Sequence, residues 1–404
     1  MEIVLGMYRL GDPGGTEHYT LIVAEQLQRL GHAVTIFSEE TGAMADLARS
    51  RGLQLATREE ALPSEVDVVF AQESITAYRL AATFPTAPLV YSIHAADFDI
   101  SVPPQLPDLV SAYVATNDRV ERRARALAVK AEVVRLRQPV DMARFTPRGS
   151  LREPPRRVVA LGSYLSGDRA RVVDDACTRA GIEIVHVGNQ HGNQVLEADG
   201  VLNDADIVVG KARVIIEAMA CGRAAYVYDV FGSDGWVTPE SYVHLEADGF
   251  SGQRGSAPVT LDRFRRDLEL YRSDMGAANR ELAMTNHNAQ RHAIELVALF
   301  ERLVPRRPRR ETPLRELGRL VRVQWQTEAR ARSLAAEAGG LREHHERLRR
   351  RVLELEPVAA RVPELERSLQ EIEAAYGDLR SQRRVRMGIA LARPVDVLRR
   401  LLRR

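Results

Sequence analysis

A glycine-rich segment near the start of the chain carries the first residues suited to ligand binding. Gly14, Gly15 and Thr16 belong to the segment GDPGGTE (11–17), which follows a short apolar run and precedes a helical pattern. Two adjacent glycines let backbone N–H groups approach a ligand closely, and the following helix presents its positive end to an anion. The segment suits a diphosphate or a sugar beside one, although an ordinary strand-to-helix turn has the same composition.

A second segment, GKARVIIEAMACG (210–222), places two cations and a carboxylate around the start of a predicted helix. Lys211 and Arg213 lie where side chains and helix N–H groups can converge on a phosphate. Glu217 can accept hydrogen bonds from the two hydroxyls of a ribose, or it is simply an exposed helix residue. Lys211 is one of only two lysines, the other being Lys130. We expect Lys211 to act in catalysis and Arg213 and Glu217 to bind substrate.

Two further candidates follow predicted strands. Asp234 and Gly235 belong to a glycine-rich segment (229–239) that we expect to form a loop on the ligand side of a sheet, with Trp236 in the core. His94 follows the apolar run 89–93, where it can polarise a substrate near neutral pH, although a lone histidine is more often structural. The sequence has no His or Cys spacing typical of a metal site, so we predict no catalytic metal and no cofactor.

The elements that position these residues alternate along the first 300 residues. Short apolar runs between helical patterns indicate parallel sheets covered by helices on both faces. A Pro-rich polar linker at 147–155 divides the series, so we predict an α/β protein with two Rossmann-like, doubly wound domains, at 1–147 and 155–303. The expected strands are 3–5, 33–37, 66–70, 89–93, 113–116, 158–161, 182–187, 206–209 and 225–228, with helices at 17–30, 169–180 and 214–221.

A different pattern follows residue 310. Apolar residues recur every seven positions from Leu334 to Leu369, followed by Tyr376, and a second set of residues, most of them apolar, lies between them. The two sets form one stripe along a helix, here called the seam, and predict a helical coiled coil over 311–380. The seam changes phase beside Pro357, and Pro363 follows, so we expect a kink or a break there. Self-association is favoured slightly over the alternative, a helical hairpin that folds back on the body.

Charge is distributed unevenly between these parts. The net charge of +2 is the sum of −9 over residues 1–300 (31 basic and 40 acidic) and +11 over residues 301–404 (26 basic and 15 acidic). The last segment, 381–404, holds eight Arg, one Asp and several apolar residues, which is typical of a basic amphipathic tail on an anionic membrane surface. A solvated helix end is the alternative. Nucleic-acid binding is disfavoured because the tail lacks aromatic residues and the body is acidic.

Composition excludes several other protein classes. The chain of 404 residues is 45% hydrophobic and 28% charged, which argues against a disordered or collagen-like protein. It has no apolar run of 18 residues, no signal-peptide pattern and only two cysteines, so we expect a cytoplasmic protein in a reducing compartment, peripheral on the inner face of the cell membrane.

Five segments in order resemble the GT-B glycosyltransferases, specifically the retaining family-four group, over residues 1–300. GGTEHYTLIVAEQLQRLGHAVTIFS (14–38) resembles the family's Gly-Gly-x-Glu loop, first helix and second strand, and VYSIHAADFD (90–99) its strand that ends in a His. YVATNDRVERRARAL (113–127) and RQPVDMARFTP (137–147) are similar to its next strand-helix unit and its interdomain signature. EAMACGRAAYVYD (217–229) is similar to the helix that holds the donor nucleotide.

The resemblance implies a donor nucleotide in the second domain and an acceptor in the first. It places donor ribose on Glu217, the diphosphate-sugar against Gly14 and Gly15, and the transferred sugar near His94. The implied activity is metal-independent, retaining transfer to a glycan or lipid-linked acceptor, in bacterial cell-surface polysaccharide assembly.

Two positions depart from the family pattern. The family's first glutamate corresponds to Val209, and Lys211 is our candidate for the phosphate cation that is otherwise missing. Two alternatives therefore stay open. One is a non-catalytic glycan-assembly scaffold with a degenerate GT-B body, and the other is a sugar-nucleotide 2-epimerase.

Overall fold

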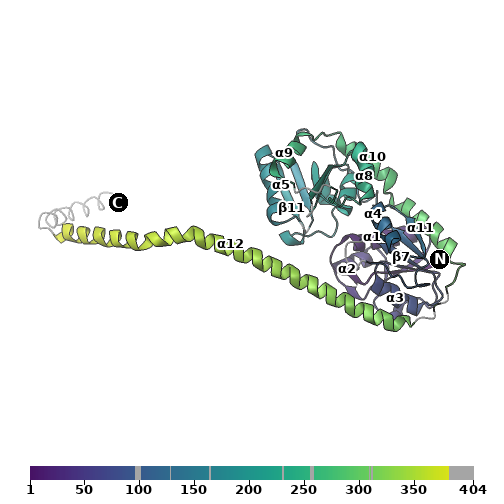
Figure 1. Cartoon of the computed structure of the whole chain (residues 1–404). Coiled ribbons are helices and arrows are strands. Elements are labelled where there is room, and N and C mark those ends of the chain that lie inside the picture. The colour runs from purple at the N-terminus through teal and green to yellow at the C-terminus, as the bar shows by residue number, and fades with distance from the viewer. Residues whose placement is uncertain are drawn as a thin grey trace, which may run out of the picture. The chain divides into compact units, whose positions relative to one another are not determined.

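The computed structural model describes residues 1–95, 102–127, 129–162, 165–229, 232–254, 259–308, 310 and 313–381. The chain divides into two compact units, Met1–Trp325 and Gln326–Arg404. The first unit contains two α/β domains, each built on one sheet (Figure 1). The predicted α/β class with two Rossmann-like domains and a helical tail is confirmed.

The first domain has a seven-stranded parallel sheet in the order β5-β3-β1-β6-β7-β8-β9. Both faces of this sheet are buried, because Ile3 and Leu5 of β1 pack in the core on one face and Val4 packs in the core on the other. The strands of the sheet are therefore continuous apolar runs in the sequence. The strands are β1 (Glu2–Gly6), β3 (Ala33–Phe37), β5 (Gln54–Ala56), β6 (Val68–Ala71), β7 (Leu89–Ile93), β8 (Ala112–Ala115) and β9 (Glu132–Arg135), with β2 (Arg9–Leu10) and β4 (Glu40–Thr41) pairing separately. The helices are α1 (Gly15–Arg29), α2 (Ala43–Ser50), α3 (Ser74–Thr83) and α4 (Asp118–Ala126), with a 3₁₀ turn at Glu59–Ala61.

The second domain has a five-stranded sheet in the order β11-β10-β12-β13-β14. Its strands are β10 (Arg157–Leu161), β11 (Glu183–Val187), β12 (Ile207–Gly210), β13 (Ala224–Asp229) and β14 (Gly232–Trp236). The helices are α5 (Gly167–Ala180), α6 (Asp199–Asn203), α7 (Arg213–Ala220), α8 (Pro239–Ala247), α9 (Leu261–Glu269) and α10 (Met275–Asn286), with a 3₁₀ turn at Asn189–His191.

The segment expected to form a loop over 229–239 is instead largely the edge strand β14. It pairs antiparallel with β13, from Tyr226 opposite Trp236 to Asp229 opposite Gly232. Gly232 and Gly235 have positive φ angles of 153° and 84°, and the register shifts between Val227 and Tyr228. The glycines therefore serve an irregular hairpin, and the expectation of a loop is wrong.

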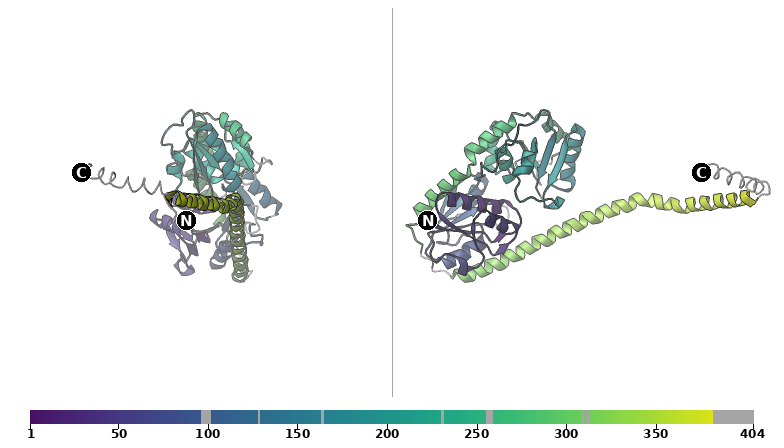
Figure 2. Two further views of the ribbon diagram at one scale, coloured as in Figure 1. Left: turned by 90° about the vertical axis from the view of Figure 1, so that its left-hand side faces the viewer. Right: turned by 180° about the vertical axis from the view of Figure 1, so that it is seen from behind.

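Helix α11 (Ala289–Leu303) follows the second domain in sequence but packs on the first. Its residues Leu296, Phe300 and Leu303 join the same core as Tyr19 and Leu27 of α1. Figure 2 shows this green helix returning toward the first domain. This differs from the expected second domain of 155–303, because the apolar stripe of α11 completes the core of the other sheet.

The C-terminal helical region is one helix, α12 (Leu314–Ser381), of 68 residues. It runs without interruption through Pro357 and Pro363, so of the kink or break expected there the break is not present, and a hairpin within 314–381 is excluded. Figure 1 shows that the helix bends along its yellow-green part. Its first turns pack on the first domain, where Trp325 contacts Tyr8 edge-on at 4.9 Å. Residues 382–404, most of the predicted basic tail, lie outside the described residues.

Candidate functional site

Three neighbouring parallel strands of the second sheet end at one cavity of about 330 Å³. Gly188 follows β11, Gly162 follows β10 and Lys211 follows β12, and all three line it. The carboxyl ends of parallel strands are the usual place for a ligand in such folds. The full lining is Pro13, Gly14, Gly15, His18, Leu161, Gly162, Val187, Gly188, Asn189, Gln194, Val195, Leu196, Ala198, Lys211, Arg213, Val214 and Glu217.

A tight turn after β12 places Lys211 at this cavity. A Cβ atom on Gly210 would lie 2.7 Å from Val214 Cγ1, so a larger residue would not fit without a shift. Ala212 has a φ of +49°, unusual for a residue other than glycine, and its N–H donates to the Phe250 carbonyl at 2.9 Å. Helix α7 begins at the next residue, so Lys211 stands beside the positive end of a helix.

Arg213 and Glu217 form a buried ion pair on the cavity wall. Arg213 Nε lies 2.6 Å from Glu217 Oε1, and the two residues are 7% and 5% exposed. Arg213 Nη1 donates to the Pro139 carbonyl, whereas Nη2 finds no hydrogen-bond partner among the residues that the structure describes. Burial lowers the pKa of Arg213 and the Glu217 carboxylate opposes that shift. An N–H group left unsatisfied on a buried guanidinium is suited to receive an anionic ligand.

The opposite wall comes from the first domain, at the start of α1. A Cβ atom on Gly14 would lie 2.3 Å from Glu17 Oε2, so a larger residue there would require the Glu17 side chain to move. His18 lies with Nδ1 2.8 Å from the Gly14 carbonyl oxygen and Nε2 2.8 Å from the Leu196 carbonyl oxygen. His18 therefore contacts a carbonyl oxygen of each domain at the cavity.

His94 lies deeper in the first domain and is not among the residues that line the cavity. Its Nε2 is 2.8 Å from Gln72 Oε1, and its ring stands edge-on to Tyr19 at 4.7 Å. Burial lowers the pKa of His94 to about 3, and the nearby His292 and Arg213 add to that effect. His94 is therefore a neutral group at physiological pH.

The remaining predicted residues lie apart from the cavity lining. Thr16 is in the first turn of α1, where its carbonyl accepts a hydrogen bond from the Thr20 hydroxyl. Asp234 and Gly235 are in β14, at the edge of the second sheet. Of the predicted site residues, the structure brings five together in the cavity lining, namely Gly14, Gly15, Lys211, Arg213 and Glu217. Thr16, Asp234, Gly235 and His94 are not part of that lining.

Sequence reasoning missed several cavity residues, among them His18, Gly162, Gly188, Asn189 and Gln194. The two glycines directly follow the predicted strands 158–161 and 182–187, so the rule that ligands bind at strand ends would have found them. His18 and Gln194 carry no comparable signal. Gln194 reaches the cavity through a contact across the domains, in which its Nε2 donates to the Pro13 carbonyl at 3.1 Å.

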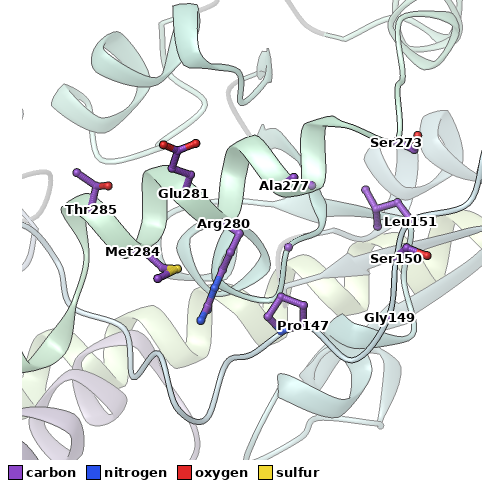
Figure 3. A pocket seen from close by; sticks show the side chains of 12 residues that line it. Pro147, Gly149, Ser150, Leu151, Ser273, Ala277, Arg280, Glu281, Met284 and Thr285 are labelled. Atoms are coloured by element: carbon purple, nitrogen blue, oxygen red, sulfur yellow. The ribbon is translucent and has the colours of Figure 1, made fainter.

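A second cavity, of about 570 Å³, lies between α10 and the linker that joins the domains (Figure 3). Arg280 on its wall donates from Nη1 to the Phe145 and Ala220 carbonyls and from Nη2 to the Met142 carbonyl. Its guanidinium therefore joins the segment before the linker, at Met142 and Phe145, to the end of α7 and stabilises the fold.

The described residues contain no group of three or more His, Cys, Asp or Glu side chains placed to hold a metal ion. Within the same residues, no helix combines the length and apolar character needed to cross a membrane.

Comparisons with known proteins identify the fold. No protein-family model matches the chain. No curated protein matches it at the level of sequence. Among solved structures it is similar to Anabaena HepE in complex with UDP, with a TM-score of 0.54 and 15% identity over 75% of this chain and 100% of that one. It is also similar to the pneumococcal O-GlcNAc transferase GtfA in complex with UDP and GlcNAc, with a TM-score of 0.51 and 10% identity over 75% of this chain and 99% of that one. The chain therefore has the GT-B fold of nucleotide-sugar glycosyltransferases.

Proposed function

We propose that this protein is a glycosyltransferase that moves a sugar from a nucleotide-sugar donor to a glycan or lipid-linked acceptor. The observation that carries the proposal is the cavity where Lys211 and the buried Arg213 at the strand ends face the Gly14–Gly15 turn. Its size and cationic wall suit a nucleoside diphosphate bound to a sugar. The UDP complexes of HepE and GtfA support that donor class.

The proposed chemistry places charge where this chain has cations. As the bond between the sugar's anomeric carbon and the diphosphate oxygen breaks, negative charge grows on the departing diphosphate. Lys211, Arg213 Nη2 and the N–H groups at the start of α7 stabilise that charge. Glu217, whose Oε1 contacts Arg213, offers Oε2 to the ribose hydroxyls. The neutral His94 orients the acceptor side of the site through Gln72 and Tyr19.

We further propose that transfer proceeds without a metal and with retention of configuration, in the assembly of a bacterial cell-surface polysaccharide. The support for metal independence is the cationic wall, which neutralises a diphosphate without a divalent ion. The support for work at the inner membrane surface is the basic tail, with eight Arg and one Asp over 381–404.

A binding screen tests the donor assignment. Nucleoside diphosphates and their sugar conjugates are tested by thermal shift in the presence of EDTA, because a ligand that binds the folded state raises the unfolding temperature. Stabilisation by a nucleotide sugar, followed by sugar transfer to a glycan acceptor, is the expected result. Absence of binding by every nucleotide would favour a scaffold, and release of a free epimerised sugar would favour a 2-epimerase.

The tail assignment is tested separately with vesicles that contain anionic lipids. Full-length protein should sediment with them, and a variant that lacks residues 381–404 should remain in the supernatant while it still binds the donor. Equal sedimentation of both proteins would contradict the membrane role.

A further inference from the structure

Helix α12 presents a long seam of apolar residues, interrupted at His345, whose large side chains are exposed in the described part of the chain. Between Leu334 and Leu379, the large apolar seam residues are 45–70% exposed, although side chains of this kind are normally buried. The seam positions are Leu334, Ala338, Leu341, His345, Leu348, Val352 and Leu355, followed by Val358, Val362, Leu365, Leu369, Ile372, Tyr376 and Leu379. They extend over about 68 Å of helix at 1.5 Å per residue.

We propose that this seam binds the same seam of a second copy of this chain, in a parallel and in-register two-stranded coiled coil. The seven-residue repeat supports a helix as the occupant, because only a helical partner can place side chains between neighbouring seam residues along this length. Three intervals of seven residues lie on each side of Leu355, from Leu334 to Leu355 and from Leu355 to Tyr376, and three to four heptads are enough to indicate a coiled coil.

Charges beside the seam favour the parallel orientation. In a parallel pair, position g of one helix faces position e of the next heptad in the partner. Three such pairs join opposite charges, namely Glu337 with Arg342, Arg351 with Glu356, and Arg361 with Glu366. In the antiparallel alignment that superposes the two halves of the seam, only two pairs join opposite charges, Arg342 with Glu373 and Arg349 with Glu366. Arg351 faces Arg361 there, which places like charges together.

The change of phase in the seam favours the in-register alignment. From Val352 the apolar positions follow at intervals of three, three and four residues, through Leu355 and Val358 to Val362. If a parallel partner helix were shifted by one heptad, its change of phase would lie opposite regular heptads of the first helix. The two seams would then separate at that point. His345 fits the same alignment, because a polar seam residue is tolerated best opposite its own copy.

In the proposed dimer, the two copies of the enzyme point in the same direction along the coiled coil. The α/β body precedes the seam in sequence and the basic segment follows it, so a parallel pair brings both basic segments to the same end. Two weak membrane contacts on one assembly bind more strongly than one. The dimer itself does not depend on the proposed transferase activity.

Sedimentation velocity of the full chain tests the dimer. The expected mass is twice the chain mass of 45.1 kDa at micromolar concentration. The double variant Leu348→Glu, Leu369→Glu, with both changes in the seam, should be a monomer. The unfolding temperature of its α/β domains, measured without a donor, should be unchanged. The matched control is Ala360→Glu combined with Ala374→Glu on the outer face of the same helix, which should remain dimeric. A monomeric or higher-order wild-type protein, or a control that dissociates as the seam variant does, would overturn the proposal.

Disulfide trapping tests the orientation. Leu341→Cys alone and Ile372→Cys alone should each form a covalent dimer on mild oxidation, because each residue faces its own copy in a parallel pair, whereas the two face each other in the antiparallel alignment. The two native cysteines, Cys177 and Cys221, are buried and give little background. If only a mixture of the two variants crosslinks, the helices are antiparallel and the proposed arrangement is wrong.

Discussion

Replacement of Lys211 by alanine removes one cation from the proposed diphosphate site and leaves the turn that carries it. A charge-assisted hydrogen bond contributes about 1.5–3 kcal/mol, so we expect the donor to bind about 10- to 150-fold more weakly. Turnover should fall as well, by up to about 10²–10³-fold, because the charge on the departing diphosphate that Lys211 stabilises grows further in the transition state. Because Lys211 is half-buried, the free energy of unfolding should change by less than about 1 kcal/mol.

The composition of the chain supplies an unusually clean assay for this prediction. Lys211 and Lys130 are its only lysines, and Lys130 is exposed, so Lys130→Ala is a matched control that should bind donor normally. Reductive methylation with ¹³C-formaldehyde labels these two side chains and the terminal amine. Titration with UDP should move the resonance that Lys211→Ala removes and leave that of Lys130 unchanged. Unaltered UDP affinity in Lys211→Ala, together with an unmoved Lys211 resonance, would refute the assignment.

Three further predictions follow from the buried groups and from the base of α12. Arg213→Met should lower the free energy of unfolding by about 3–5 kcal/mol in urea, because it leaves the buried Glu217 carboxylate without a partner. Adding Glu217→Gln should restore part of that loss, and equal stability of the single and double variants would contradict the ion pair. The pKa of His94 is lowered from 6.5 to about 3, so the folded state prefers the neutral ring, and its stabilisation is complete above pH 6.5 and declines below. Between pH 6.5 and 5 this amounts to about 2 kcal/mol, and His94→Gln should flatten the measured pH dependence by that amount. Trp325→Ala should lower the unfolding free energy by about 1 kcal/mol through loss of the ring contact with Tyr8, with donor affinity unchanged by calorimetry.

The parallel strands were predictable because both of their faces are buried. The expected strands 33–37 and 89–93 are the observed β3 and β7, since such strands read as unbroken apolar runs with sharp ends. β14 was not predictable, because Gly232–Trp236 has little strand propensity of its own. Its pairing with β13 determines its conformation, and that contact is not visible in a local pattern.

The same distinction applies to the site. Lys211 and Arg213 lie where β12 ends and α7 begins, and Gly14 and Gly15 lie where α1 begins, so topology places each pair at the ligand-binding end of its own sheet. His18 lies within α1, and the carbonyl that it contacts belongs to Leu196, 178 residues away. Contacts between domains at that separation depend on how the two sheets meet, which the sequence pattern does not encode.

Val209 stands where the family that the sequence resembles has its first glutamate. Val209 is fully buried within β12 and packs in the core of the second domain. A glutamate at this position would therefore bury an unpaired carboxylate in that core and would not reach the cavity. The shortened connection from β12 to α7 instead brings Lys211 to the strand end, within the cavity lining. We therefore expect the donor sugar to be held by the polar side chains already present there, His18, Asn189 and Gln194, and the change relative to the family pattern to alter donor choice more than transfer itself.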